Sequence, residues 1–344
     1  MRLRSILTLL LSALLLAACD ASEDSPPSNA TTQAEGEAGA FPVTIAHKYG
    51  STTIDFAPER VVVAGLREQD ALLAVGTVPV ATTEWYNEHP GAIFPWAKDE
   101  LGSATLPTVL SYEDGLQVEK IAALRPDLIL AIYSGMTKKE YTMLSKLAPV
   151  VAQPKGKVDY GSSWQEETLI SGTAVGKPKQ AQELVDRTEK LIAGAAAAHP
   201  EFEDQSAANV SDYQGIFVYG PQDVRTRMLE QLGFTYPDEL RAAFPGEFGG
   251  QLSDEKVEAL DVGALVWFAD GDRTVAELKR DPVYSKLDVR EEGRDIFIRA
   301  NDRVYEATSF PSVLSMPTLI EELVPRLAAA ADGDPKTSTD QQPG

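Results

Sequence analysis

Short apolar runs alternate with helical segments through most of this 344-residue chain, and that alternation constrains the fold more than any other feature. Four pairs follow one order, with predicted strands at residues 60–65, 127–132, 215–219 and 264–268 and predicted helices at residues 69–76, 137–147, 226–232 and 275–280. Gly76 is placed to end the first helix, and Thr137 and Glu140 are spaced as a capping box at the start of the second. Because strands that alternate with helices form parallel sheets covered by helices, the sequence predicts an α/β fold.

A long amphipathic helix is predicted between the first two pairs and the last two. Its stripe over residues 178–198 consists of Ala181, Leu184, Val185, Thr188, Leu191, Ile192 and Ala195. Pro178 suits the first helical turn, and a helix of this length is about 30 Å long, enough to join two lobes. We therefore expect an N-terminal α/β lobe at residues 41–160, connecting helices at 161–200 and a C-terminal α/β lobe at 201–330. One continuous three-layer domain is the alternative.

The first residues have the features of an export signal. Arg2 and Arg4 precede an apolar segment over residues 6–16 that is too short to span a bilayer, and Leu16-Ala17-Ala18-Cys19 follows. This ending resembles a bacterial lipobox, and Cys19 is the single cysteine of the chain, so it cannot form an internal disulfide. We expect residues 1–18 to be removed and Cys19 to carry lipid at the extracytoplasmic face of the cell membrane. The alternative is an ordinary signal peptide whose cleavage site adjoins a cysteine.

Residues 19–40 are expected to form a disordered tether between the lipid and the folded part. From Asp20 to Ala40 they contain no aromatic residue and no aliphatic residue larger than alanine, so they cannot bury enough surface to fold. The tail at residues 331–344 is also expected to be disordered. The intervening 290 or so residues suffice for two ordinary lobes, and a monomer is expected.

The charge balance disfavours nucleic acids and anionic lipid headgroups as partners. Removal of residues 1–18 takes away two arginines and leaves 29 basic against 52 acidic side chains, a formal charge of −23. Nucleic acids and anionic lipid headgroups are held largely by clustered lysine and arginine, so neither is an expected partner. Contact with the membrane is expected through the lipid anchor only.

Aromatic residues and arginines gather in the loops that follow the predicted strands. These loops are residues 65–68, 82–86, 132–134, 219–227, 267–268 and 303–305. Ligands of open α/β sheets bind at the carboxyl ends of the strands. Aromatic rings and guanidinium groups suit a bulky ligand with flat faces and acceptor oxygens, although Trp267 and Phe268 fit core positions better. Trp85 and Arg225 fit packing or ligand binding equally well.

Several segments, in order, resemble the iron-siderophore substrate-binding proteins of ABC importers. They are residues 47–50, 58–65, 69–80, 95–97, 121–129, 144–150, 172–177 and 312–315, and the resemblance covers essentially all of 41–330. It implies a bilobed class III substrate-binding protein, with two parallel-sheet lobes joined by a long α-helix. It also implies a shallow cleft for a ferric siderophore that is delivered to the permease subunits of an ABC importer. The iron would be held by the siderophore, with no cofactor and no metal ligand from the protein.

The resemblance also implies roles for particular residues. Expected ligand contacts are Arg67, Trp85, Tyr86, Tyr133, Arg225, Arg227 and Tyr305, with Arg225 and Arg227 donating to chelate oxygens. Some hydroxamate binders carry a tryptophan where this chain has Asp223, which leaves the chelate class open between hydroxamate and mixed types and disfavours a strongly anionic tricatecholate.

The resemblance further implies docking on the permease through one exposed glutamate on each lobe. Glu140 and Glu255 are the candidates by their position. A glutamate in a first helical turn is also favoured by capping and by the helix dipole, so a purely structural role is the alternative for both.

Other functions are less well supported by the residues. Haem or a corrinoid is an alternative ligand on the same fold, and an anchored enzyme of unknown reaction is a second alternative. Residues 172–177 resemble a phosphate loop that is one residue short, which favours a turn between helices. His47, His89 and His199 lack metal-ligand spacing, and no motif places a nucleophile beside the acidic pairs, so we expect a binding protein rather than an enzyme.

Overall fold

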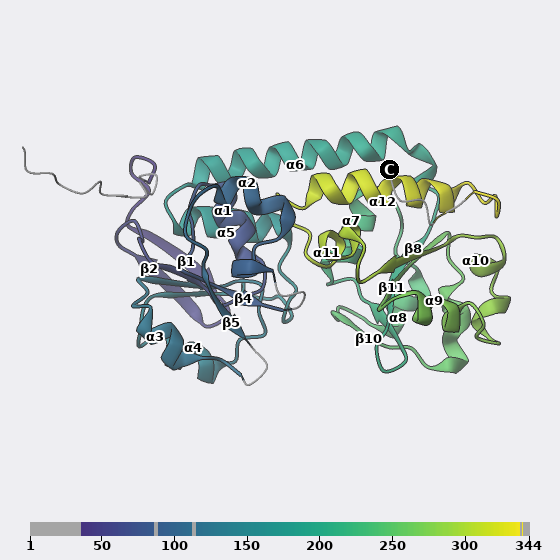
Figure 1. Cartoon of the computed structure of the whole chain (residues 1–344), viewed down its shortest axis with the longest axis horizontal. Helices are drawn as coiled ribbons and strands as arrows, with labels where there is room; N and C mark the ends of the chain where they lie inside the picture. The colour runs from purple at the N-terminus through teal and green to yellow at the C-terminus, as the bar shows by residue number, and fades with distance from the viewer. Residues whose placement is uncertain (1–35, 86–88, 112–114, 338, 340–344) are drawn as a thin grey trace, which may run out of the picture. The chain divides into compact units, whose positions relative to one another are not determined.

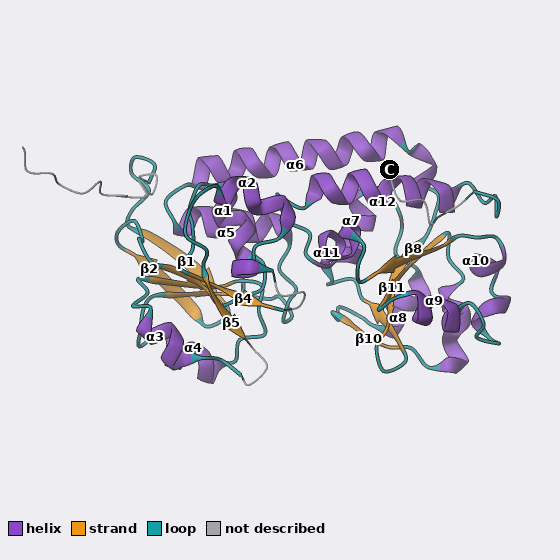
Figure 2. Cartoon of the chain, viewed as in Figure 1, coloured by secondary structure: helices purple, strands orange, loops and turns teal. Residues whose placement is uncertain are grey.

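The computed structural model describes residues 36–85, 89–111, 115–337 and 339, which belong to one compact unit. Two five-stranded sheets form its framework, and helices cover them (Figure 2). The signal segment and Cys19 lie outside the described residues, so the predictions made for them stay predictions.

The first sheet is entirely parallel, as predicted. Its order is β5(Thr108–Ser111), β4(Ala81–Glu84), β3(Val61–Val63), β6(Leu128–Ala131) and β7(Val150–Ala152). The central strands β3 and β6 are fully buried and apolar along their whole length, which is typical of parallel strands with helices on both faces. A separate antiparallel hairpin, β1(Val43–His47) and β2(Gly50–Ile54), precedes this sheet.

Two groups of helices sandwich the first sheet. The α-helices of this half are α1(Glu68–Ala74), α2(Lys98–Leu101), α3(Val118–Ala123), α4(Lys138–Leu144), α5(Trp164–Ala174) and α6(Pro178–Ala198), with 3-10 turns η1(Pro90–Ala92) and η2(Pro95–Ala97). Side chains of α5 and α6 pack with Val61 and Val63 on one face, and Ile121 of α3 and Leu144 of α4 pack with Val62 on the other. The predicted capping box of Thr137 and Glu140 is present at the start of α4.

The second sheet is mixed, and the prediction that it is parallel was wrong in part. Its order is β10(Gly249–Gln251), β9(Ile216–Tyr219), β8(Ala207–Asp212), β11(Ala264–Ala269) and β12(Asp295–Arg299). β8, β11 and β12 are parallel, whereas β9 pairs antiparallel with both β8 and β10. The reason is local: Gly215, with φ +107°, lies in the short connection from β8 to β9, and a connection of this length can only form a hairpin.

The remaining helices belong to the second half. They are α7(Val224–Gln231), α8(Asp238–Ala243), α9(Asp272–Leu278), α10(Asp288–Glu291), α11(Arg303–Ser309) and α12(Met316–Ala331), with 3-10 segments η3(Pro200–Phe202), η4(Asp254–Leu260) and η5(Tyr284–Lys286). Trp267 and Phe268 of β11 are 0% and 4% exposed, which confirms that they are core residues.

The two halves repeat one arrangement. In the first, α3, β6, α4 and β7 follow in chain order; in the second, η4, β11, α9 and β12 do. In each sheet the inner strand of this series lies between the central strand and the edge strand, all three being parallel. This correspondence lets a residue of one half be matched with a residue of the other.

The long helix α6 has the bounds predicted from its stripe. Leu184, Val185 and Ile192 are buried in a cluster that contains strand residues from both sheets, and α12 packs beside α6 (Figure 1). Leu191 was expected in the stripe but is 40% exposed, because it lies at the margin of the buried face.

The described residues begin at residue 36, ahead of the expected start of the N-terminal lobe at residue 41. The backbone N–H of Glu37 donates to the carbonyl oxygen of Gly176 over 2.7 Å. The Glu37 carboxylate accepts the N–H groups of Lys179 and Gln180, each over 3.0 Å. These are first-turn N–H groups of α6 that have no partner within the helix, so Glu37 caps α6 from outside it. Residues 36–40 are therefore part of the folded body, which corrects the expected end of the tether. No helix among the described residues is long and apolar enough to cross a membrane.

Candidate ligand-binding site

Arg225 is held between an acid and two aromatic rings. Its Nη1 donates to Oδ2 of Asp223 over 2.7 Å, and its guanidinium carbon lies 4.2 Å from the ring centre of Tyr219 and 5.5 Å from that of Phe268. Asp223 is completely buried and also accepts the backbone N–H of Arg225 at the start of α7. Burial raises the pKa of Asp223, and the neighbouring Arg225 opposes that rise. The arginine therefore has a fixed orientation and a compensated charge.

Tyr305 lies on the same aromatic group. Its ring meets that of Phe268 edge to face at a centroid distance of 5.5 Å, and burial raises the pKa of its hydroxyl. Because Phe268 contacts both Arg225 and Tyr305, the structure brings these two predicted residues together around Phe268 of β11.

Arg227 links the C-terminal half to the connecting segment. Its Nη2 donates to the carbonyl oxygen of Gly161 over 2.9 Å and to the carbonyl and side-chain oxygens of Gln222, each over 2.7 Å. Burial lowers the pKa of Arg227. These bonds hold the start of α7 against Gly161 of the connecting segment, in addition to any contact of Arg227 with a ligand.

Tyr133 lies at the end of β6, where the two halves meet. It is 3% exposed, its ring contacts Tyr160 at 5.6 Å, and burial raises the pKa of its hydroxyl to about 12. The cluster Leu66, Phe94, Tyr133, Val224 and Phe310 joins loops of both halves, and we call it the inter-lobe seam. Tyr133 thus belongs to the same cluster as Val224, the residue between Asp223 and Arg225 at the start of α7.

Arg67 is not an exposed residue of the seam, which corrects our expectation of a direct ligand contact. It is 0% exposed, and its Nε donates to Glu167 over 2.6 Å. Its Nη1 and Nη2 donate to the carbonyl oxygens of Pro311 and Ser162, and its guanidinium lies 3.8 Å from the ring centre of Tyr133. A buried arginine needs such partners, and Glu167 supplies them from α5, distant in sequence. The guanidinium of Arg67 thus packs against the Tyr133 ring and helps to hold it in place.

The loop after β4 contains the remaining predicted contacts. Trp85 is 57% exposed, and Tyr86 lies outside the described residues. Beyond it, Nε2 of His89 lies 2.8 Å from Oε1 of Glu306, the residue that follows Tyr305 on α11. This contact joins the loop to the C-terminal half beside Tyr305.

The two predicted docking glutamates differ in their surroundings. Oε2 of Glu140 accepts the backbone N–H and the hydroxyl of Thr137, each over 2.7 Å, and the side chain is half-buried. Glu255 lies exposed on η4. Only Glu255 therefore presents a carboxylate without a capping bond of this kind.

Sequence reasoning missed Glu119, although the signal was present. Glu119-Lys120-Ile121 follows the first residue of α3, and Glu255-Lys256-Val257 follows the first residue of η4. Each glutamate lies nine residues before the first residue of the strand that follows. Ile121 and Val257 are both buried, and both glutamates are exposed. The repeat of the two halves therefore pairs Glu255 with Glu119 rather than with Glu140.

The described residues contain no group of three or more histidine, cysteine, aspartate or glutamate side chains that could hold a metal ion. The arginine and aromatic side chains described above are suitable contacts for a bulky ligand with flat faces and acceptor oxygens.

Comparison with known proteins identifies the family. Residues 61–301 match the family described as periplasmic binding protein. The chain belongs to this family. The Fe(3+) dicitrate-binding periplasmic protein FecB of Escherichia coli K12 is 26% identical to it over 255 residues, which cover 72% of this chain and 79% of FecB.

Two solved structures have the same fold. A periplasmic solute binding protein from Mycobacterium smegmatis superposes with a TM-score of 0.74 at 35% identity, covering 84% of this chain and 98% of its own. PiaA from Streptococcus pneumoniae, in complex with ferrichrome, superposes with a TM-score of 0.73 at 27% identity and covers 85% and 99%. The bilobed α/β prediction is thereby confirmed.

Proposed function

We propose that this protein is an extracytoplasmic receptor that binds a ferric siderophore in the cleft between its lobes and delivers it to an ABC importer for iron uptake. One observation carries the proposal: Arg225, stacked on Tyr219 and held by Asp223, contacts the same Phe268 ring of β11 that Tyr305 meets edge to face. That arrangement offers a guanidinium group and flat rings to a ligand with acceptor oxygens. Two similar proteins support it, since PiaA was solved with ferrichrome and FecB is named for ferric dicitrate.

The charge of the site favours a hydroxamate or mixed chelate. Ferric trihydroxamates are nearly neutral, whereas ferric tricatecholates are strongly negative. Asp223 lies 2.7 Å from Arg225 and offsets its charge, so the pair attracts a highly anionic ligand weakly. Arg225 still donates hydrogen bonds to chelate oxygens, and Tyr133, Trp85 and Tyr305 supply apolar contact.

Delivery needs a contact with the permease, and we propose Glu119 and Glu255 for it. Support comes from their matched positions and their exposure. Glu140 is the earlier candidate for the N-terminal lobe, but its carboxylate already caps α4. The proposal also includes lipid attachment at Cys19, lobes at 41–160 and 201–330, a monomeric receptor, and no catalytic step.

Ligand titration of the purified protein tests the function. Tryptophan quenching is recorded with ferric hydroxamate, mixed and catecholate siderophores, and with haem and a corrinoid as the alternatives. We expect binding of a ferric hydroxamate or mixed siderophore that is tighter than binding of its iron-free form. Alanine at both Arg225 and Arg227 is expected to weaken binding by about 1.5–3 kcal/mol per lost charge-assisted bond.

Arg273→Ala is the matched control, because this arginine is 90% exposed and pairs with Glu277 on its own helix. Equal affinity of the double variant and the wild type would remove both arginines from the site. Preference for haem or a corrinoid, or no binding of any ferric siderophore, would refute the proposed ligand class.

A further inference from the structure

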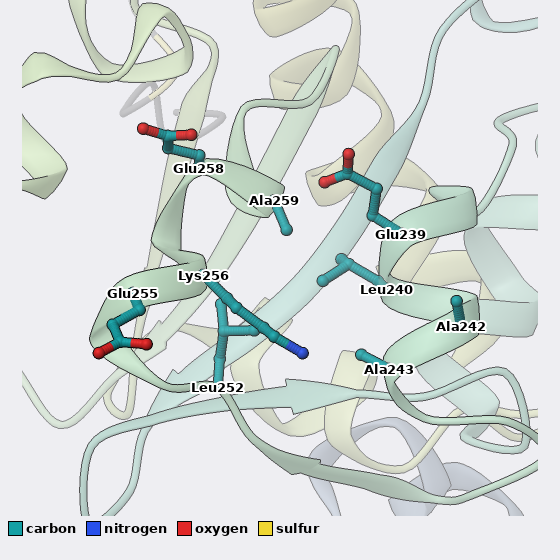
Figure 3. A pocket seen from close by; sticks show the side chains of 9 residues that line it. All are labelled: Glu239, Leu240, Ala242, Ala243, Leu252, Glu255, Lys256, Glu258 and Ala259. Carbon is teal, nitrogen blue, oxygen red and sulfur yellow. The ribbon is translucent and has the colours of Figure 1, made fainter.

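A second concave surface lies between α8 and η4 of the C-terminal half, away from the seam (Figure 3). It has a volume of about 420 Å³. Leu240 and Leu252, both buried, form its apolar floor, and the small side chains of Ala243 and Ala259 leave it open. We call it the α8–η4 groove.

Carboxylates border the α8–η4 groove. Glu239, Glu255 and Glu258 lie at its edges and are exposed, and Lys256 extends across it toward Ala243 (Figure 3). Three acids against one base leave the edge negatively charged. A cationic side chain of a partner would be attracted there while an apolar neighbour contacts the floor.

An adjoining cavity of about 580 Å³ extends the groove and shares Glu239, Glu258 and Ala259 with it. Tyr236 lines this cavity, is 3% exposed, and its hydroxyl has no hydrogen-bond partner among the residues that the structure describes. A buried hydroxyl without a partner costs free energy unless another group satisfies it. This observation is independent of the acidic edge, and the hydroxyl can form a hydrogen bond with a polar group of a second molecule that enters the cavity.

The two halves have corresponding sequences at α3 and η4, but the groove contains an acidic residue that the first half lacks. Glu119-Lys120-Ile121-Ala122-Ala123-Leu124 corresponds to Glu255-Lys256-Val257-Glu258-Ala259-Leu260. Alanine in the first half, at position 122, thus matches Glu258 of the groove edge. Contacts made through Glu119 and Glu255 alone would be nearly equivalent in two orientations related by a half turn, whereas a contact with Glu258 distinguishes them.

We propose that the α8–η4 groove docks an extracytoplasmic segment of the importer's permease that carries a lysine or arginine next to an apolar side chain. The proposal rests on the proposed function and adds to it a second contact beside Glu255. The cation lies between Glu239 and Glu258, and the apolar side chain lies on Leu240 and Leu252. The groove thereby sets which lobe meets which permease subunit.

Site-specific photo-crosslinking and uptake test this docking. A photoreactive amino acid replaces Ala242, which is exposed at the groove, or Ala197, which is exposed on α6, in the full-length protein in its own membranes. We expect an adduct with a permease subunit, identified by mass spectrometry, from position 242 and none from 197. Equal adducts from both positions, or none from 242, would overturn the proposal.

Charge reversal supplies a second test. The pair Glu239→Arg and Glu258→Arg is compared with the pair Glu183→Arg and Glu189→Arg on the exposed side of α6. We expect the groove pair to lower the uptake rate of the radiolabelled ferric siderophore at least about tenfold, with ligand affinity within about twofold of wild type. Wild-type uptake by the groove pair would overturn the inference and leave the proposed function standing. Failure of the wild type to bind any ferric siderophore would instead refute the proposed function.

Discussion

The two candidate contacts of the N-terminal lobe can be separated by single substitutions. Glu140→Ala removes one half of the capping box at the start of α4, in which the carboxylate accepts the N–H of Thr137 over 2.7 Å and the Thr137 hydroxyl accepts the N–H of Glu140 over 3.2 Å. Glu119→Ala removes an exposed carboxylate in the first turn of α3. Each variant removes one glutamate from a helix start, so each is a control for the other.

Glu140→Ala is expected to change the stability of the protein, whereas Glu119→Ala is expected to change its uptake activity. Loss of a cap costs about 0.5–2 kcal/mol, so the free energy of unfolding of Glu140→Ala should fall by about 1 kcal/mol. For Glu119→Ala it should change by less than about 0.5 kcal/mol, because the side chain is exposed. A charge pair that becomes buried on docking is worth about 2–5 kcal/mol, so Glu119→Ala and Glu255→Ala should each lower uptake by a factor of ten or more.

Denaturant unfolding and uptake by cells at low ligand concentration measure the two effects. We expect Glu140→Ala to lose stability and transport normally, and Glu119→Ala to keep its stability and transport poorly. Ligand affinity should remain that of the wild type in both, since neither residue lies at the seam. The reasoning is refuted if Glu119→Ala transports normally, or if Glu140→Ala fails to transport while it keeps its stability.

Three further predictions follow from buried or processed groups. Asp223→Asn keeps a good N-cap for α7 but leaves the charge of Arg225 without its compensating carboxylate. The ratio of catecholate to hydroxamate affinity should therefore rise at least about tenfold, because the interaction is about 2 kcal/mol per unit of ligand charge at a separation of roughly 7 Å. An unchanged ratio in a fluorescence titration would contradict this. Burial raises the pKa of Asp70 to about 6 from 3.8. The folded state therefore binds this proton more tightly, and the free energy of unfolding should fall by about 3 kcal/mol as the pH rises from about 4 to about 7, a slope that Asp70→Asn should flatten in unfolding experiments; identical slopes for both proteins would exclude Asp70 as the cause. Cys19→Ala should release the protein from the membrane fraction or leave uncleaved precursor, since acyl chains provide about 0.8 kcal/mol per buried methylene; unchanged fractionation and mass would argue against lipidation.

Local signals were sufficient for much of the fold. The stripe of α6, its Pro178 and the capping box of Thr137 lie within a few residues of the structure they specify, and the observed bounds agree with them. The direction of β9 was missed because it depends on a hairpin with β8, and the apolar pattern of a strand is the same in either direction.

The site was only partly predictable, since its electrostatics depend on distant residues. Arg67 follows β3 just as a cleft residue would, but Glu167 binds it from a position 100 residues later in the chain. The importance of Asp223 was visible as a departure from a pattern, whereas its bond to Arg225 required coordinates. Glu119 could have been found from sequence alone, by aligning the chain with itself.

Because Glu37 caps α6, residues 20–36 separate Cys19 from the folded body, and their length should limit how the protein reaches the permease. If Cys19 is acylated, the seventeen residues 20–36 have a maximum contour length of about 60 Å, at 3.3–3.6 Å per residue. This segment joins the body at α6, on one face of the first sheet, whereas Glu119 lies in the first turn of α3 on the opposite face. If the permease contacts Glu119, the receptor has to turn relative to its membrane anchor to present that face, and the length of residues 20–36 limits this turn. Stepwise shortening of residues 20–36 should therefore stop uptake at a definite length while ligand binding continues unchanged.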